Sequence, residues 1–212
     1  MDINQTEEQQ VAAIKGFWKE NGNAIIAGLF LGFSGFIGYG YYQDHQLQQE
    51  LMVADSYQSL VELVDGDETE YRDAATTFIN EHGDTSYASL ASLALAKNAA
   101  EHQDWAEVAK HLKSALKQSA NSGITGIATV RLARVQVQLG EYDEAITTLS
   151  SSLPASFTAA VEETKGDAYL KQNNIELARN AYQAALSVEG TNPSPSLQMK
   201  LDDLVDNVTL VN

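Results

Sequence analysis

Residues 132–149 have the sequence LARVQVQLGEYDEAITTL, and this short stretch decides the fold. Apolar side chains recur at helical spacing on both sides of Gly140, a pattern typical of two helices joined by a tight turn. Tyr142 and Ala145 begin the second helix of the pair. One such pair cannot bury its apolar face alone, so we expect further pairs to stack against it.

The same pattern returns along the chain. Bulky residues stand beside each predicted turn at spacings of 34, 37 and 33 residues: Tyr71, Trp105, Tyr142 and Ile175. Small or β-branched residues follow three positions later: Ala74, Val108, Ala145 and Ala178. Large residues come four positions after those: Phe78, Leu112, Leu149 and Tyr182. A helix–turn–helix period near 34 residues resembles the tetratricopeptide repeat, and the first unit fits the pattern least well.

The remaining features predict an all-α fold. The chain has three prolines, all from Pro154 onward, and no sustained alternation of apolar and polar residues. From Ser194 the tail has an apolar face typical of a capping helix, formed by Leu197, Leu201, Leu204, Val205 and Val208. The prediction is one transmembrane helix followed by a tetratricopeptide-like helical solenoid.

The predicted transmembrane helix lies at 21–43, a stretch without a charged side chain. Its apolar centre, 24–42, is long enough to span a bilayer of about 30 Å. Aromatic residues near both ends fit interfacial belts, and no small-x-small cleavage site follows. We therefore expect an uncleaved signal-anchor rather than a buried core helix.

Lysine and arginine indicate the orientation. Lys15 and Lys19 precede the helix, and no cation follows it until Arg72. The positive-inside rule then predicts a cytoplasmic segment at 1–20 and a repeat domain at 44–212 on the outer side of the membrane, which for a bacterial inner membrane is the periplasm.

Glycines mark one face of the predicted membrane helix. They are Gly28, Gly32, Gly35 and Gly38, spaced so that they fall on the same side. Small residues let helix backbones approach closely in lipid, so this face could pack against another helix. Glycine is also common in membrane helices, so the pattern alone leaves both interpretations open.

The composition excludes several classes of function. The formal net charge is −16, whereas nucleic-acid binding needs a basic surface. There is no cysteine, and no two of the four histidines have the spacing of a helical metal pair. The acidic loop 65–70 lacks the glycine and ligand spacing of a calcium loop. We expect no enzymatic activity, cofactor or metal.

Stacked helix pairs form a concave groove lined by the first helix of each pair. The repeat register predicts these groove residues: Leu93, Lys97, Glu101, Val130, Arg134, Val137, Gln138, Glu163, Asp167 and Leu170. Leu93, Val130 and Glu163 stand where carboxylate-clamp repeat proteins have a lysine. A ligand held by its C-terminal carboxylate is therefore disfavoured.

Three blocks carry a likeness to a known family: FWKENG at 17–22, YASLASLALA at 87–96 and RLARVQVQL at 131–139. With these blocks the whole chain resembles the YfgM family of ancillary Sec translocon subunits. The resemblance implies association with the SecYEG channel and with the membrane-anchored periplasmic chaperone PpiD. It also implies a role in passing translocated polypeptides to periplasmic chaperones, and no catalytic motif.

Three hypotheses therefore compete. The first is a membrane-anchored adaptor or chaperone-like subunit at the translocon. The second is a self-assembling envelope scaffold, in which the glycine face and the repeats form homo-oligomers. The third, an enzyme or metal sensor, has no residue pattern in its favour.

Overall fold

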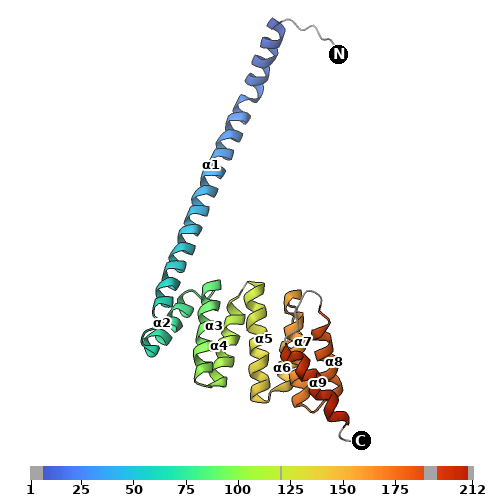
Figure 1. Cartoon of the computed structure of the whole chain (residues 1–212). Helices are drawn as coiled ribbons and strands as arrows, with labels where there is room; N and C mark the ends of the chain where they lie inside the picture. The colour runs from blue at the N-terminus through green and yellow to red at the C-terminus, as the bar shows by residue number, and fades with distance from the viewer. Residues whose placement is uncertain (1–6, 120, 189–194, 210–212) are drawn as a thin grey trace, which may run out of the picture. The chain divides into compact units, whose positions relative to one another are not determined.

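The computed structural model describes residues 7–119, 121–188 and 195–209, and side chains from 9 to 204 within those ranges. The chain divides into two compact units, Met1–Met52 and Val53–Asn212. The described residues form α-helices and one short 3-10 helix (Figure 1). These elements are α1 (Glu7–Glu62), α2 (Glu68–Glu81), α3 (Ser86–Glu101), α4 (Trp105–Gln118), α5 (Ser122–Leu139), α6 (Tyr142–Thr148), η1 (Ala155–Phe157), α7 (Thr158–Lys171), α8 (Ile175–Leu186) and α9 (Pro195–Thr209).

The first unit consists of the N-terminal part of α1, which contains the predicted membrane segment 21–43. This helix is long and apolar enough to cross a membrane, and none of its most apolar window is buried. Leu31 and Phe36, for example, are 76% and 77% exposed. A core helix of a soluble protein would bury such side chains, so the exposure favours the membrane interpretation.

The second unit begins inside α1, at Val53. Leu60 of α1 is buried with Tyr71 and Phe78 of α2. The Tyr57 ring lies 5.8 Å from that of Phe78 and 5.2 Å from that of Tyr87. The end of α1 thus serves as the first helix of the first pair, continuing directly from the apolar segment.

Three helix pairs follow: α3 with α4, α5 with α6, and α7 with α8 (Figure 1). Their turns share one backbone conformation, because Gln103, Gly140 and Asn173 all have positive φ, at 59°, 83° and 60°. In each turn the next amide donates back to a carbonyl near the helix end, as in the bond of 3.0 Å from Asp104 N to Ala99 O. The turn therefore repeats together with the helices.

The first pair corrects the register expected from sequence. The second helices of the pairs begin at Glu68, Trp105, Tyr142 and Ile175, a spacing of 37, 37 and 33 residues. Tyr71 is therefore the fourth residue of α2 rather than its first. Asp67 caps α2 by accepting from Glu70 N at 2.9 Å, as Asp104 caps α4. With this three-residue shift Tyr71 takes the position of Val108 and Ala75 that of Leu112; both are buried, whereas Ala74 is only half-buried.

The C-terminal helix α9 covers the last pair, as predicted for a capping helix. Leu197 and Leu204 are buried against Ala178, Tyr182 and Ala185 of α8. The side chains of Val205 and Val208 lie outside the described residues. The all-α repeat fold predicted from sequence is confirmed.

Candidate protein-interaction site

Helix α5 forms one wall of the candidate site. Asn121 starts it by accepting from Gly123 N at 2.9 Å and from Ile124 N at 3.1 Å, and Gly140 ends it. Beyond its first turn the core covers most of this helix. Between the first turn and Leu139, the exposed side chains of α5 form one stripe at helical spacing: Ile127, Arg131, Arg134 and Gln138.

Helix α7 forms the facing wall. Its buried side anchors it, because the ring of Tyr182 from α8 occupies the place where Gly166 would carry a Cβ. Thr164 is fully buried and donates to Ala160 O at 2.7 Å. Glu163, Asp167 and Leu170 of the same helix are half-buried. Only a glycine lets Tyr182 pack this closely against α7.

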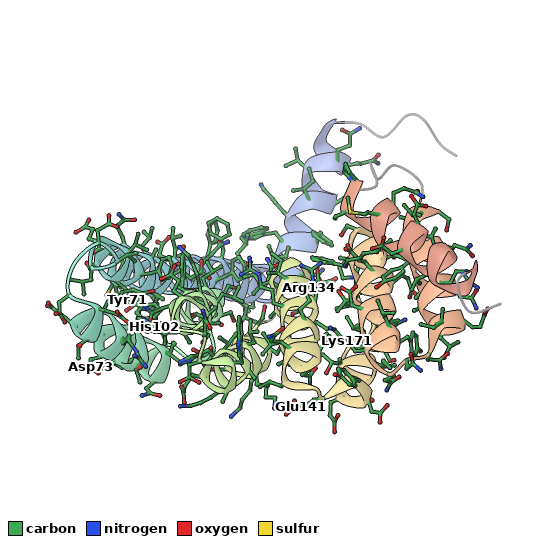
Figure 2. All side chains as sticks on the ribbon, turned by 60° about the horizontal axis from the view of Figure 1, so that its bottom comes forward. Tyr71, Asp73, His102, Arg134, Glu141 and Lys171 are labelled. Atoms are coloured by element: carbon green, nitrogen blue, oxygen red, sulfur yellow. The ribbon has the colours of Figure 1, made fainter. Side chains whose placement is uncertain are left out.

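A pocket of about 290 Å³ lies between these helices and α9. Its lining contains five of the residues predicted for the groove: Arg134, Val137, Gln138, Asp167 and Leu170. A sixth, Glu163, contacts Lys200 at the same place. Figure 2 shows two of the cations of this pocket, Arg134 on α5 and Lys171 on the neighbouring α7.

Lys200 of α9 lies at the polar end of the pocket. Its Nζ is 2.9 Å from Glu163 Oε1 and 2.8 Å from Asp167 Oδ1, and Tyr182 donates its hydroxyl to Asp167 at 2.7 Å. Burial alone would lower the pKa of Lys200, but hydrogen bonds to Asp167 and Glu163 outweigh it and hold that pKa above its ordinary value. Burial and the bond to Asp167 also raise the pKa of Tyr182 far above its usual range.

The other predicted groove residues lie elsewhere. Leu93 and Val130 are buried in the core between helices, so they offer no surface to a partner, contrary to the expectation from register. Lys97 and Glu101 are exposed on α3 and lie 3.7 Å apart as an ion pair. Glu163 is the equivalent of Leu93 and Val130 in the last pair, but it is only half-buried, beside α9.

Three residues of the pocket were not predicted: Thr164, Lys171 and Lys200. Lys171 could have been found, because it follows Glu101 and Gln138 at the spacing of 37 and 33 residues that separates the second helices. Lys200 could not, since it belongs to the capping helix and reaches the site only through the return of that helix onto α7.

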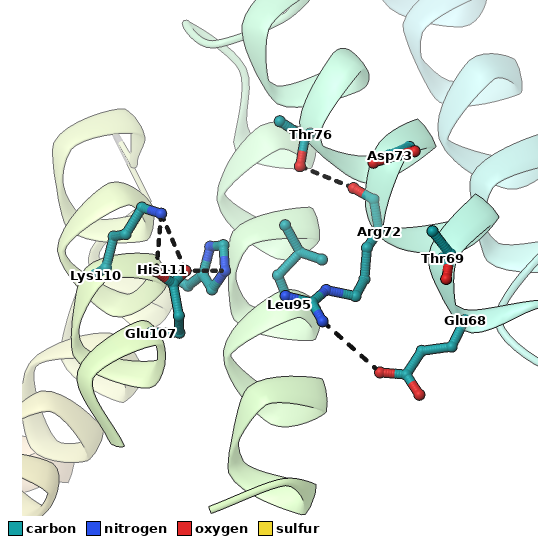
Figure 3. Close-up of a pocket in the computed structure, with 9 residues that line it drawn as sticks. All are labelled: Glu68, Thr69, Arg72, Asp73, Thr76, Leu95, Glu107, Lys110 and His111. Carbon is teal, nitrogen blue, oxygen red and sulfur yellow. Dashed lines mark hydrogen bonds and ion pairs between the residues drawn. The ribbon is translucent and has the colours of Figure 1, made fainter. Parts of the chain in front are cut away.

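A second pocket, of about 440 Å³, lies between α2, α3 and α4 (Figure 3). Its cations face acidic partners. Arg72 is 4.0 Å from Glu68, while Lys110 and His111 are 3.0 and 3.4 Å from Glu107. Burial lowers the pKa of His111, an effect that the Glu107 charge opposes. Arg72 and Lys110 each already have a carboxylate partner, and Asp73 adds a further negative charge to the lining, so this pocket makes a weaker candidate for binding. No cluster of metal-ligating side chains occurs in the described ranges.

The apolar segment of α1 carries a groove of its own. About 610 Å³ of open space lies along a face lined by Ile25, Gly28, Leu29, Gly32, Phe33 and Phe36. A Cβ added at any of the four glycines predicted for helix packing would meet no atom within 4 Å. Gly28 and Gly32 therefore make a hollow that the chain does not itself fill.

Comparison with known proteins gives a consistent result. Residues 15–206 match the family model of a tetratricopeptide repeat-like domain. The chain is 34% identical to a Haemophilus influenzae protein named ancillary SecYEG translocon subunit, with 93% of this chain and 97% of the relative aligned. Proteins of the same name from Escherichia coli and Neisseria gonorrhoeae are 33% and 30% identical, over 96% of this chain and 99% and 100% of the relatives. The resemblance noted in the sequence is thereby confirmed, and the chain belongs to the family of ancillary SecYEG translocon subunits.

Proposed function

We propose that this protein is a non-catalytic, membrane-anchored adaptor of the Sec translocon. Its repeat domain binds polypeptide or partner protein in the periplasm and links translocated chains to periplasmic chaperones. PpiD, the partner implied by the family resemblance, is the first chaperone to test. Its N-terminal segment stays in the cytoplasm, as Lys15 and Lys19 predict.

The observation that carries the proposal is the continuity of α1. One helix contains an exposed apolar segment of membrane-spanning length and, in its last turns, the first helix of the repeat domain. A repeat domain with a pocket between its first helices is suited to holding another protein. The names of the relatives supply the translocon as the place of action.

Within the membrane, we assign the contact with the translocon or its chaperone to the face of Gly28, Gly32, Gly35 and Gly38. Lipid provides no hydrophobic drive for helix association, so close backbone approach is the main source of affinity. The open space along Gly28 and Gly32 would admit the side chains of a neighbouring helix.

Affinity purification of the full-length protein from its own membranes in mild detergent, followed by mass spectrometry, tests the proposal. We expect to recover channel subunits and a periplasmic chaperone. A Gly28→Leu/Gly32→Leu variant should recover fewer of them, because leucine fills the hollow.

The matched control is Ser34→Leu/Gly40→Leu, which adds bulk on other sides of the same helix. A Cβ at Gly40 also meets nothing within 4 Å, so this variant disturbs no internal contact there. Recovery of the protein alone, in the wild type, would favour the self-assembling scaffold and overturn the translocon proposal. Equal losses in both variants would overturn the assignment to the glycine face.

A further inference from the structure

The two arginines on the exposed stripe of α5 differ from the other arginines of the chain. Arg72 lies 4.0 Å from Glu68, and Arg179 lies 2.9 Å from Glu176. Arg131 and Arg134 have no carboxylate within ion-pair distance among the described residues, and Arg134 only donates to the neutral Thr164 Oγ1 at 3.3 Å. Arginine is suited to binding a carboxylate with two parallel hydrogen bonds, and here that capacity is unused.

A third cation without a carboxylate partner in the described ranges stands across the pocket. Lys171 is exposed at the end of α7, and Figure 2 shows it near Arg134. Val137 and Leu170 are half-buried and form the apolar part of the lining of the same pocket. The pocket therefore combines positive charge at its walls with an apolar floor.

The acidic residues of the pocket do not cancel this charge. Glu163 and Asp167 are both occupied by Lys200, and Asp167 also accepts the hydroxyl of Tyr182. Lys200 brings one positive charge against these two carboxylates, so with Arg134 and Lys171 the site keeps a net positive charge, in a chain whose formal net charge is −16. Positive charge concentrated in one place on an acidic protein selects for negative charge on the partner.

We propose that this pocket binds a polypeptide segment in which an acidic side chain stands beside an apolar one. Arg134 and Lys171, with Arg131 one turn away, hold the carboxylates, and Val137 and Leu170 receive the apolar side chain. This inference rests on the proposed adaptor function and names the chemistry of the segment that the adaptor holds.

The charges of the pocket also disfavour a basic polypeptide segment. A basic segment would have to displace Lys200 from two carboxylates that it already contacts at 2.8 and 2.9 Å, while passing Arg134 and Lys171. An uncharged apolar segment would leave the cations without partners.

The test is a binding measurement with the full-length protein in detergent. Three short fluorescent peptides are compared, each acetylated and amidated so that no terminal charge contributes. One alternates leucine with glutamate, and the others replace glutamate by glutamine or by lysine. We expect fluorescence anisotropy to show the glutamate peptide binding about tenfold more tightly than the glutamine peptide, with the difference shrinking as salt rises.

The variant Arg134→Gln/Lys171→Gln should weaken binding of the glutamate peptide about tenfold and leave the glutamine peptide almost unchanged. Lys113→Gln/Lys117→Gln is the matched control. It removes the same net charge from exposed lysines of α4 that have no ion pair in the described part of the chain. The control should change binding less than about twofold, because charges far from the site are screened.

Tighter binding of the lysine peptide, equal binding of the glutamate and glutamine peptides, or equal effects of the two double variants would overturn the inference. The co-purification experiment reports separately on the adaptor function. If channel subunits are recovered while glutamate confers no preference, only the chemistry assigned to the pocket is wrong. If glutamate is preferred but no channel subunit is recovered, the adaptor function is wrong.

Discussion

Individual residues carry much of what makes this repeat array regular, and the turns show it best. Gln103 and Asn173 adopt the same left-handed conformation as Gly140. A side chain at such a position strains the backbone, and asparagine tolerates the strain better than glutamine does. At equivalent positions of the fold, Gln103 therefore lowers the stability of the protein more than Asn173 does.

Gln103→Gly should stabilise the protein by about 0.5–1 kcal/mol, because relief of strain exceeds the added entropy of the unfolded chain. Asn173→Gly should change stability by less than that, and Gly140→Ala should lower it. Urea unfolding of the purified protein in detergent, followed by circular dichroism, gives the three values. A Gln103→Gly protein less stable than the wild type would contradict this account of the turn.

The contact between Gly166 and Tyr182 gives a second residue-scale prediction. A Cβ at Gly166 would lie 2.4 Å from the Tyr182 ring, so Gly166→Ala should cost about 1–3 kcal/mol of unfolding free energy. In the preceding pair Ala133 and Leu149 occupy the equivalent positions, and both are buried. Gly166→Ala/Tyr182→Leu copies that combination, so its cost should fall below the sum of the single costs. If the losses of unfolding free energy in the two single variants add up to that of the double variant, the two positions do not interact.

His111 predicts a dependence of stability on pH. Burial, with Lys110 and Arg72 nearby, lowers its pKa in the folded state more than Glu107 raises it. The neutral form is therefore favoured by folding, and this contribution is present above about pH 6.5 and lost as pH falls through the lowered folded pKa. His111→Gln should lose less stability than the wild type between about pH 7.5 and 5.5. Identical profiles for the variant and the wild type would remove His111 as the cause.

At the scale of helices, α9 is held by both apolar contacts and charge. Lys200 links it to Glu163 and Asp167, whose side chains are 22% and 30% exposed. Lys200→Gln leaves two half-buried carboxylates without their cation. After allowance for partial solvent screening, we expect a loss of about 1–2 kcal/mol.

The control for α9 is Lys97→Gln, which breaks the pair with Glu101 where both side chains are more than half exposed. It should cost less than about 0.5 kcal/mol. Thermal unfolding monitored by circular dichroism compares the two variants. Equal shifts would mean that Lys200 contributes no more than a surface ion pair does.

The helices also show how far sequence reasoning reaches. Trp105, Tyr142 and Ile175 begin their helices as predicted, because each follows a turn at the end of a clear apolar stripe. In the first pair the aromatic Tyr71 is a misleading signal, because it is the fourth residue of α2 rather than the first. Asp67, one residue before Glu68, was the better signal, since a capping carboxylate fixes the helix start more directly than an aromatic side chain does.

The candidate site was predictable only in part, for a related reason. Repeat spacing places Arg134, Val137 and Asp167 on the first helices of their pairs, and the structure brings them to one pocket. The same spacing cannot tell which positions a neighbouring helix covers, so Leu93 and Val130 were included although the core buries them. Lys200 depends on tertiary packing of a segment outside the repeats.

At the scale of the whole molecule, the net charge of the chain and the length of its apolar segment bear differently on its interaction with a membrane. The chain has a formal charge of −16, which disfavours binding to anionic lipid, whereas the apolar segment of α1 is long enough to span a membrane. The proposed orientation then depends on very few residues. Lys15 and Lys19 are the only lysines or arginines that precede Arg72.

Protease treatment of spheroplasts tests that orientation. With a periplasmic repeat domain, we expect protease to degrade the domain in spheroplasts and to spare it in intact cells. Lys15→Gln/Lys19→Gln removes all lysine and arginine charge flanking the apolar segment, so a fraction of the chains should insert in reverse and become protected. Lys113→Gln/Lys117→Gln removes the same charge far from the membrane segment and should leave every chain accessible. Protection of the wild-type domain in spheroplasts would place it in the cytoplasm, where it could not receive translocated polypeptides.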